Sequence, residues 1–223
     1  MRIIFSLAVA LLLAGGWGVS QAKADVCGSV SGNLVKNCGF ETIGAASIPD
    51  WTASGNQEGG YNGNYWGVDN SNPNSGTYEG YFGVQGSILG QVGPALHLSQ
   101  GVSAPQGFYY RITFYLDQNG PTNAPGYTNF FSAFFDGLQL MSETNAPNSG
   151  GYEKFSFLEE SDGASPTLSF SFQNDDDVFF LDDVSVQKLG PTPEPASLLL
   201  VAPILGAFWL SRGRRKQVLS RER

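Results

Sequence analysis

A series of short segments with alternating apolar and polar residues limits the fold of this chain more than any other feature. The alternating segments are residues 110–116, 154–157, 168–173 and 180–186, and residues 130–135 are apolar on both faces. Gly, Pro, Asn and Asp separate these segments, and no long stretch repeats with the period of a helix. A period of two between turn residues indicates β-strands. The sequence therefore predicts an all-β domain over residues 25–189, an antiparallel β-sandwich with jelly-roll connections.

Two of these segments place polar side chains on defined faces. Arg111, Thr113 and Tyr115 fall on the face opposite the apolar residues of their strand. Asp182, in contrast, falls on the same side as Val184, so its carboxyl is expected to face the core. A carboxylate that faces a core requires a cation or hydrogen-bond donors.

Residues 1–24 have the layout of a secretory signal peptide. Arg2 precedes the apolar run Ile3–Ala14, and residues 22–24 supply a small-residue exit, Ala-Lys-Ala. These parts predict a signal helix that is cleaved after Ala24. The alternative is a membrane anchor, but the run is shorter than the roughly 20 apolar residues that a spanning helix needs. We therefore expect export, with Asp25 as the first residue of the mature protein.

Residues 190–223 carry a second sorting pattern, in which a Pro-Glu-Pro motif, a short apolar run (Ser197–Leu210) and a basic cluster follow one another. Its key residues are Pro193, Glu194, Pro195, Arg212, Arg214 and Arg215. The run is near the lower limit for a transmembrane helix, and the basic cluster would stay on the cytoplasmic side. This order resembles the PEP-CTERM signal of Gram-negative bacteria that make extracellular polysaccharide. The resemblance implies that an exosortase processes the tail, and a plain tail anchor is the alternative.

The mature segment is strongly acidic. Residues 25–195 contain nineteen acidic residues against four basic ones, which are Lys36, Arg111, Lys154 and Lys188. Such a surface repels nucleic acid and other polyanions. It favours divalent cations, neutral glycans or simple solubility, and it excludes nucleic acid as a partner.

Cys27 and Cys38 are the only cysteines of the chain. In an exported protein, an isolated even pair at this spacing predicts a disulfide. Closing so short a loop stabilises the fold by about 3 kcal/mol in the chain-entropy picture. A metal site is the alternative, but His97 is the only histidine and lies far away in the sequence.

The beginning and end of the mature segment resemble one family of sandwich domains. Asn33–Glu41 is followed by Pro49–Trp51, and the last predicted strand, Phe180–Val186, contains Asp-Asp-Val-Ser. These motifs are similar to those of carbohydrate-binding-module-like, galactose-binding-like domains, which begin N-L-x-x-N-G-G-F-E. Cys38 departs from that pattern at the first glycine, as expected if Cys27 staples the entry strand. The resemblance implies that the first and last strands lie side by side and that Trp51 belongs to the core.

In the related domains, acidic residues of the first and last strands hold a calcium ion together with loop carbonyls. The resemblance therefore implies a structural Ca²⁺ bound by Glu41 and Asp182, since hard oxygen ligands suit this ion. The alternative is that Asp182 caps a turn or accepts backbone N–H bonds. Asp175–Asp177 is a second acidic cluster, but consecutive acids in a turn more often form a solvated hairpin tip, which we expect here.

The polar segment Ser54–Gly80 has too little aliphatic content for a core strand, which predicts a long surface loop. Tyr61, Tyr65 and Trp66 lie in this segment and are candidates for ligand binding. An exposed aromatic ring can stack on the apolar face of a sugar. The alternative is that these rings fold back and cover the edge of the sandwich.

No catalytic arrangement is recognisable in the sequence. His97 lies in an ordinary apolar stretch, and the chain has no phosphate loop, zinc spacing or nucleophile elbow. We therefore predict a non-catalytic protein that binds glycan or associates with extracellular polysaccharide. Its expected location is the cell envelope, cell surface or extracellular matrix of a Gram-negative bacterium, after a transient membrane anchor. The alternatives are a structural matrix protein without a specific ligand and, less favoured, a secreted glycoside hydrolase that uses a pair of carboxylates.

Overall fold

The computed structural model of the chain describes residues 23–45, 47–55, 66–84, 95–118, 129–163 and 166–191, with the backbone alone at 84, 175 and 176. These residues form a single turn of 3₁₀ helix, η1 (Cys27–Ser29), and nine strands. The strands are β1 (Thr52–Gly55), β2 (Trp66–Asp69), β3 (Glu79–Val84), β4 (Leu96–Gly101), β5 (Phe108–Gln118), β6 (Asn129–Phe135), β7 (Leu138–Thr144), β8 (Glu153–Glu160) and β9 (Thr167–Pro191). Within the described ranges, no helix has the length and apolar character to cross a membrane. The predicted signal helix and C-terminal transmembrane helix lie outside these ranges.

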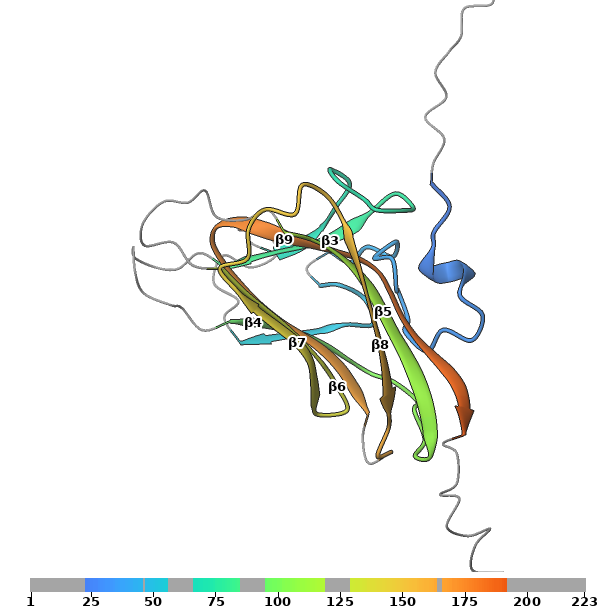
Figure 1. The fold of residues 1–223 in the computed structure, drawn as a ribbon. Coiled ribbons are helices and arrows are strands. Elements are labelled where there is room, and N and C mark those ends of the chain that lie inside the picture. The colour runs from blue at the N-terminus through green and yellow to red at the C-terminus, as the bar shows by residue number, and fades with distance from the viewer. Residues whose placement is uncertain are drawn as a thin grey trace, which may run out of the picture.

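Two antiparallel sheets share the long strand β9 (Figure 1). The first half of β9 lies between β4 and β6, which gives the strand order β1-β4-β9-β6-β7. The second half lies between β3 and β5, which gives the order β2-β3-β9-β5-β8. The prediction of an all-β antiparallel sandwich is therefore confirmed, while the jelly-roll connectivity stays a prediction.

The continuity of β9 corrects one expectation. Asp175–Asp177 was expected at a hairpin tip, but the strand runs through these residues from one sheet into the other. Phe82 pairs with Phe179, whereas Val84 pairs with Asn174, so β9 has extra residues at this point. Extra residues on one strand bend it and increase its twist, which lets a single strand serve both sheets.

The core between the sheets is built mainly from phenylalanines. Phe82 and Phe172 stack with their ring centroids 4.3 Å apart, and Phe170 meets Phe114 edge to face at 5.2 Å. Trp51 is buried and stacks on Phe40 at 5.8 Å, as the resemblance implied. Full burial of one such side chain contributes about 1.5–3 kcal/mol, so the alternating aromatic residues are the main source of stability.

The segment predicted as a long surface loop contains regular structure. Part of Ser54–Gly80 forms β2, and its last residues begin β3. β2 is an edge strand that pairs with β3 through Trp66↔Phe82. The low aliphatic content misled the prediction because one tryptophan, rather than a row of aliphatic residues, fixes this strand to the core.

Candidate functional site

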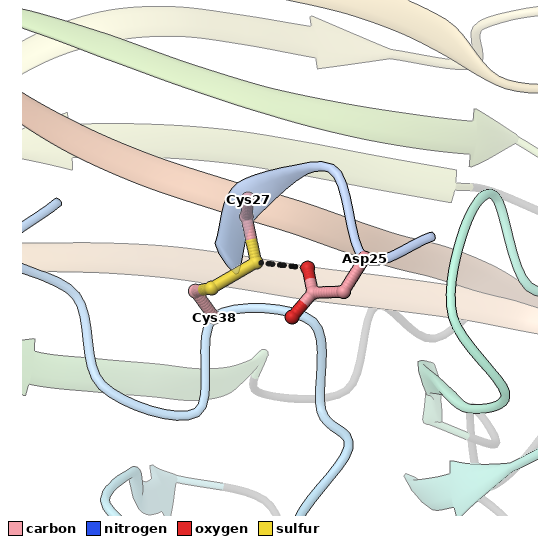
Figure 2. Close-up of side chains that lie close together, drawn as sticks. All are labelled: Asp25, Cys27 and Cys38. Carbon is pink, nitrogen blue, oxygen red and sulfur yellow. Dashed lines mark hydrogen bonds between the residues drawn. A yellow bond between two sulfur atoms is a disulfide. The ribbon is translucent and has the colours of Figure 1, made fainter. Parts of the chain in front are cut away.

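The predicted Cys27–Cys38 disulfide is present, with an S–S distance of 2.01 Å. It ties η1 to the entry segment, and Figure 1 shows this N-terminal part beside the last part of β9. Figure 2 shows Asp25 against the disulfide, with one carboxylate oxygen 3.0 Å from Cys27 Sγ. A disulfide sulfur carries no hydrogen, so this approach is a contact rather than a hydrogen bond. Asp25, Cys27 and Cys38 have the proximity of metal ligands, but sulfurs that are bonded to each other do not supply the thiolates that a metal requires.

Asp182 and Asp183 both contact the loop of residues 74–78 between β2 and β3. Asp182 Oδ2 accepts the N–H groups of Asn74 and Ser75 at 2.9 and 3.1 Å. Asp183 accepts from Asn74 Nδ2 at 2.6 Å, from Ser75 Oγ at 2.7 Å and from Cys27 N at 3.0 Å. Both aspartates are buried, with 0% and 2% of their surface exposed.

A bulge in β9 explains how two consecutive aspartates reach one loop. Successive side chains of a regular strand point to opposite faces. Here Thr113 pairs with Ser185 but Tyr115 pairs with Asp182, so β9 has one more residue than β5. Asp183 takes the left-handed backbone conformation, with φ of 50°. This bulge turns Asp183 toward the loop that also binds Asp182.

Glu41 completes what we call the acid clamp, defined as Glu41, Asp182 and Asp183 around residues 74–78. Glu41 Oε1 accepts the N–H groups of Thr77 and Tyr78 at 2.7 and 3.0 Å. Gly76 immediately precedes these two residues with φ of +61°, and a Cβ there would collide with the Glu41 carboxylate. The sequence resemblance had paired Glu41 with Asp182, and the structure brings both to the same loop.

The calcium prediction is compatible with the charge of the clamp. The alternative, in which Asp182 accepts backbone N–H bonds, describes the contacts of this residue, since Asp183 N also donates to its Oδ1 at 2.7 Å. Burial nevertheless raises the pKa of Asp182 to about 8, and the neighbouring Asp183 charge adds to this effect. The N–H donors therefore do not fully replace the lost solvent. A Ca²⁺ held by Glu41 and Asp182 would supply the missing positive charge through hard oxygen ligands, and it stays a prediction.

A second group of carboxylates lies beside the clamp, in which Glu79 and Asp117 are buried and Asp69 is half-buried. Burial, followed by a hydrogen bond with Asp69, raises the pKa of Glu79 to about 8. Glu79 Oε2 receives no hydrogen bond, which agrees with a proton on this carboxyl that is shared with Asp69. Asp117 accepts from Asn72 Nδ2 at 2.8 Å and from Ser149 Oγ at 2.9 Å. These acids hold the loop that follows β2 in place.

The other predicted site residues have different outcomes. Trp66 is 5% exposed and belongs to the core, so the prediction that it presents a ring for sugar stacking is wrong. The physical reason is its position in β2, where the large apolar ring is buried against the sandwich. Tyr61 and Tyr65 lie outside the described residues, as do the sorting residues Pro193, Glu194, Pro195, Arg212, Arg214 and Arg215.

A hollow on the outer face of the β8–β5–β9 sheet was not predicted. It lies between this face and the N-terminal segment and has a volume of about 180 Å³. We call it the β5 groove. Its lining residues are Val26, Cys27, Val30, Arg111, Thr113, Tyr115, Lys154, Asp183, Ser185 and Gln187. The N-terminal wall is held by the disulfide and by a hydrogen bond from Val26 N to Ser75 Oγ at 2.9 Å.

Strand register assembles the floor of the β5 groove. On β5, Arg111, Thr113 and Tyr115 point away from the core, as the sequence predicted. Arg111 pairs with Gln187 of β9, and Thr113 pairs with Ser185. Tyr115 pairs with Lys154 of β8, whose ammonium lies 5.7 Å from the centre of the tyrosine ring. The groove therefore combines one aromatic ring, hydroxyl and amide groups, and two cations.

The two cations of the groove are available to a ligand. The Arg111 side chain is exposed, and its guanidinium has no hydrogen bond or ion pair to any described residue. The Asp183 carboxylate also lines the groove, but both its oxygens accept bonds from Cys27, Asn74 and Ser75. The alternation around Arg111 was visible in the sequence, whereas the pairing that adds Lys154 and Ser185 was not.

No protein-family model matches the chain, and no curated protein matches its sequence. Among solved structures, it is similar to a family 61 carbohydrate-binding module, TmCBM61, solved with β-1,4-galactotriose. That match has 20% identity, covers 71% of this chain and 100% of the other, and has a TM-score of 0.50. The CBM22-1 xylan-binding domain of Xyn10C from Paenibacillus barcinonensis matches with 13% identity over 77% and 99% of the two chains, at a TM-score of 0.44. The enzymatically active domain of tailspike protein 4 from bacteriophage CBA120 matches with 17% identity over 70% and 21%, at 0.48. The first match shows that this chain shares the β-sandwich fold of that module.

Proposed function

We propose that this chain is a non-catalytic glycan-binding protein and that the β5 groove is its binding site. The observation that carries the proposal is the composition of the groove on a sandwich of this fold. Tyr115 supplies a ring, while Thr113, Ser185 and Gln187 supply groups that hydrogen-bond to sugar hydroxyls. Its volume is below the about 300–1,000 Å³ of pockets that enclose a small ligand, so the groove suits one or two units of a longer chain.

We further propose that the protein is exported and sorted, as the signal peptide and the Pro-Glu-Pro tail predict. Extracellular polysaccharide would then be the glycan that the protein meets. The tail has its own test, which is the mass and location of the protein in cells with and without exosortase. If the mass and location are the same with and without exosortase, the tail is a plain membrane anchor and not a processing signal.

Glycan binding is tested with the exported protein on a panel of neutral and charged polysaccharides by affinity electrophoresis. We expect retardation by at least one polysaccharide and about a tenfold loss of affinity in Tyr115→Ala, since stacking on a ring contributes about 1 kcal/mol or more. Tyr109→Ala, another tyrosine of β5 that does not line the groove, is the matched control. Absence of binding by the wild-type protein to every polysaccharide would favour the structural matrix protein instead.

A further inference from the structure

The β5 groove differs in charge from the remainder of the domain. Residues 25–195 hold four basic residues, and two of these, Arg111 and Lys154, line this one hollow. They come from two neighbouring strands and lie on the same outer face. An exposed arginine in a domain with nineteen acidic residues would find an ion-pair partner easily, yet Arg111 has none among the described residues.

The geometry points to a ligand carboxylate, and we propose that the groove binds a uronic acid unit of a mainly neutral polysaccharide. This inference rests on the proposed glycan-binding function and names its substrate class. The planar guanidinium of Arg111 presents paired N–H donors that match a carboxylate, and such charge-assisted bonds are about twice as strong as neutral ones. Tyr115 offers a ring to the sugar, and Thr113 lies between Arg111 and Tyr115 on β5 with Ser185 beside it on β9, where both hydroxyls can meet those of the sugar.

The acidity of the domain restricts this ligand further. Nineteen acidic residues repel a dense polyanion, since surface charges act over about 8 Å at physiological ionic strength. The groove has a volume of about 180 Å³, which suits one charged sugar unit at a time. The Asp183 carboxylate in its wall has both oxygens bound to other donors. We therefore expect the groove to bind a polysaccharide with widely spaced carboxylates in preference to a dense polyanion such as heparin.

The test compares glucuronoxylan, which carries widely spaced glucuronate on a neutral backbone, with the same polymer after chemical reduction of its carboxyls. We expect the exported protein to bind the charged polymer about tenfold more tightly than the reduced one. Arg111→Gln removes this difference and leaves the melting temperature unchanged. Lys36→Gln, which removes the same charge outside the groove, keeps the difference. Heparin is not bound by any of these proteins.

Three other outcomes would overturn the uronate inference. Equal binding of both polymers by the wild-type protein overturns the uronate inference and leaves glycan binding intact. Equal losses in Arg111→Gln and Lys36→Gln show an effect of net charge and also overturn it. Failure to bind either polymer, together with failure on the neutral panel, removes both the inference and the proposed function.

Discussion

The acid clamp and the β5 groove are neighbours that share Asp183, yet they use charge in opposite ways. In the clamp, two buried aspartates and the half-buried Glu41 accept most of the N–H donors of a single loop. In the groove, exposed Arg111 has no partner among the described residues, and Lys154 contacts only a ring there. A satisfied polar group contributes to the fold, whereas an unsatisfied exposed group is free to bind a ligand. Substitutions in the clamp should therefore change stability, and those in the groove should change binding.

The largest expected effect is that of Asp182→Ala in the clamp. It leaves the N–H groups of Asn74, Ser75 and Asp183 without an acceptor, and each buried donor without one costs about 1–3 kcal/mol. We expect a loss of about 4 kcal/mol in the free energy of unfolding, measured by urea denaturation. Asp182→Asn keeps an oxygen acceptor and should lose less. A loss below about 1 kcal/mol for the alanine variant would show that the clamp does not hold the loop.

Removal of the disulfide should affect the N-terminal segment, which forms one wall of the β5 groove and also bonds to the clamp through Cys27 N. The double substitution Cys27→Ser and Cys38→Ser should lower the free energy of unfolding by about 3 kcal/mol, because the unfolded chain regains the entropy of the closed loop. Glycan affinity should fall as well, since Val26 and Cys27 line the groove. Wild-type protein treated with reductant is the control. Equal urea midpoints with and without reductant would contradict the prediction.

The stability of the domain should depend on pH through two buried carboxyls, Asp182 of the clamp and Glu79 beside it. The folded-state pKa values of Glu79 and Asp182 are about 8, well above those of unfolded carboxyls. Because these carboxyls hold a proton more tightly in the folded protein, protonation stabilises the fold. This contribution is fully present below about pH 4 and is lost as the pH rises through about 8. Between these two pKa values each carboxyl lowers the free energy of unfolding by up to about 1.4 kcal/mol per pH unit, so in calcium-free buffer the two together should lower it by roughly 2–3 kcal/mol between pH 6 and pH 7. Asp182→Asn should flatten the slope, and a rise in stability over this range would refute the assignment.

Calcium should act on the clamp alone. At a free Ca²⁺ concentration of ten times Kd, binding to the folded state raises the free energy of unfolding by about 1.4 kcal/mol. Chelator should reverse the gain in melting temperature, and Glu41→Gln should abolish it. Glycan affinity of the groove should change little. Identical melting curves with and without chelator would show that N–H donors alone serve the carboxylates.

The smallest expected effect on stability is that of Arg111→Gln. Arg111 is exposed and makes no described bond, so the free energy of unfolding should change by less than about 0.5 kcal/mol. Thermal melts monitored by circular dichroism measure it. A loss of 1 kcal/mol or more would mean that Arg111 belongs to the fold, and the contrast between groove and clamp would fail.

The sequence was informative wherever the period of two decided the outcome. Alternation assigned the inward residues of β5 and also Val184 and Val186 of β9, because a side chain's face in a regular strand depends only on its parity. It was wrong for Phe180 and Asp182, because the bulge in β9 changes the parity: Leu181 belongs to the core, and Asp182 pairs with the outward-facing Tyr115. The disulfide was equally readable, since two cysteines in a chain that is predicted to be exported have one pairing. The N-terminal and C-terminal motifs indicated that Glu41 and Asp182 belong together. These are local features, or features that composition alone restricts.

Strand pairing, bulges and burial were decided only by the tertiary structure. Parity places Asp183 on the face opposite Asp182, and the bulge in β9 brings both to one loop. The burial of Trp66 depends on the pairing of β2 with β3. The groove needs the register that sets Lys154 beside Tyr115 and Ser185 beside Thr113, across long separations in the chain. Register depends on the summed packing of two strands rather than on the sequence of either strand alone. The sequence by itself therefore determined the β-sandwich, whereas the tertiary packing determined the candidate site.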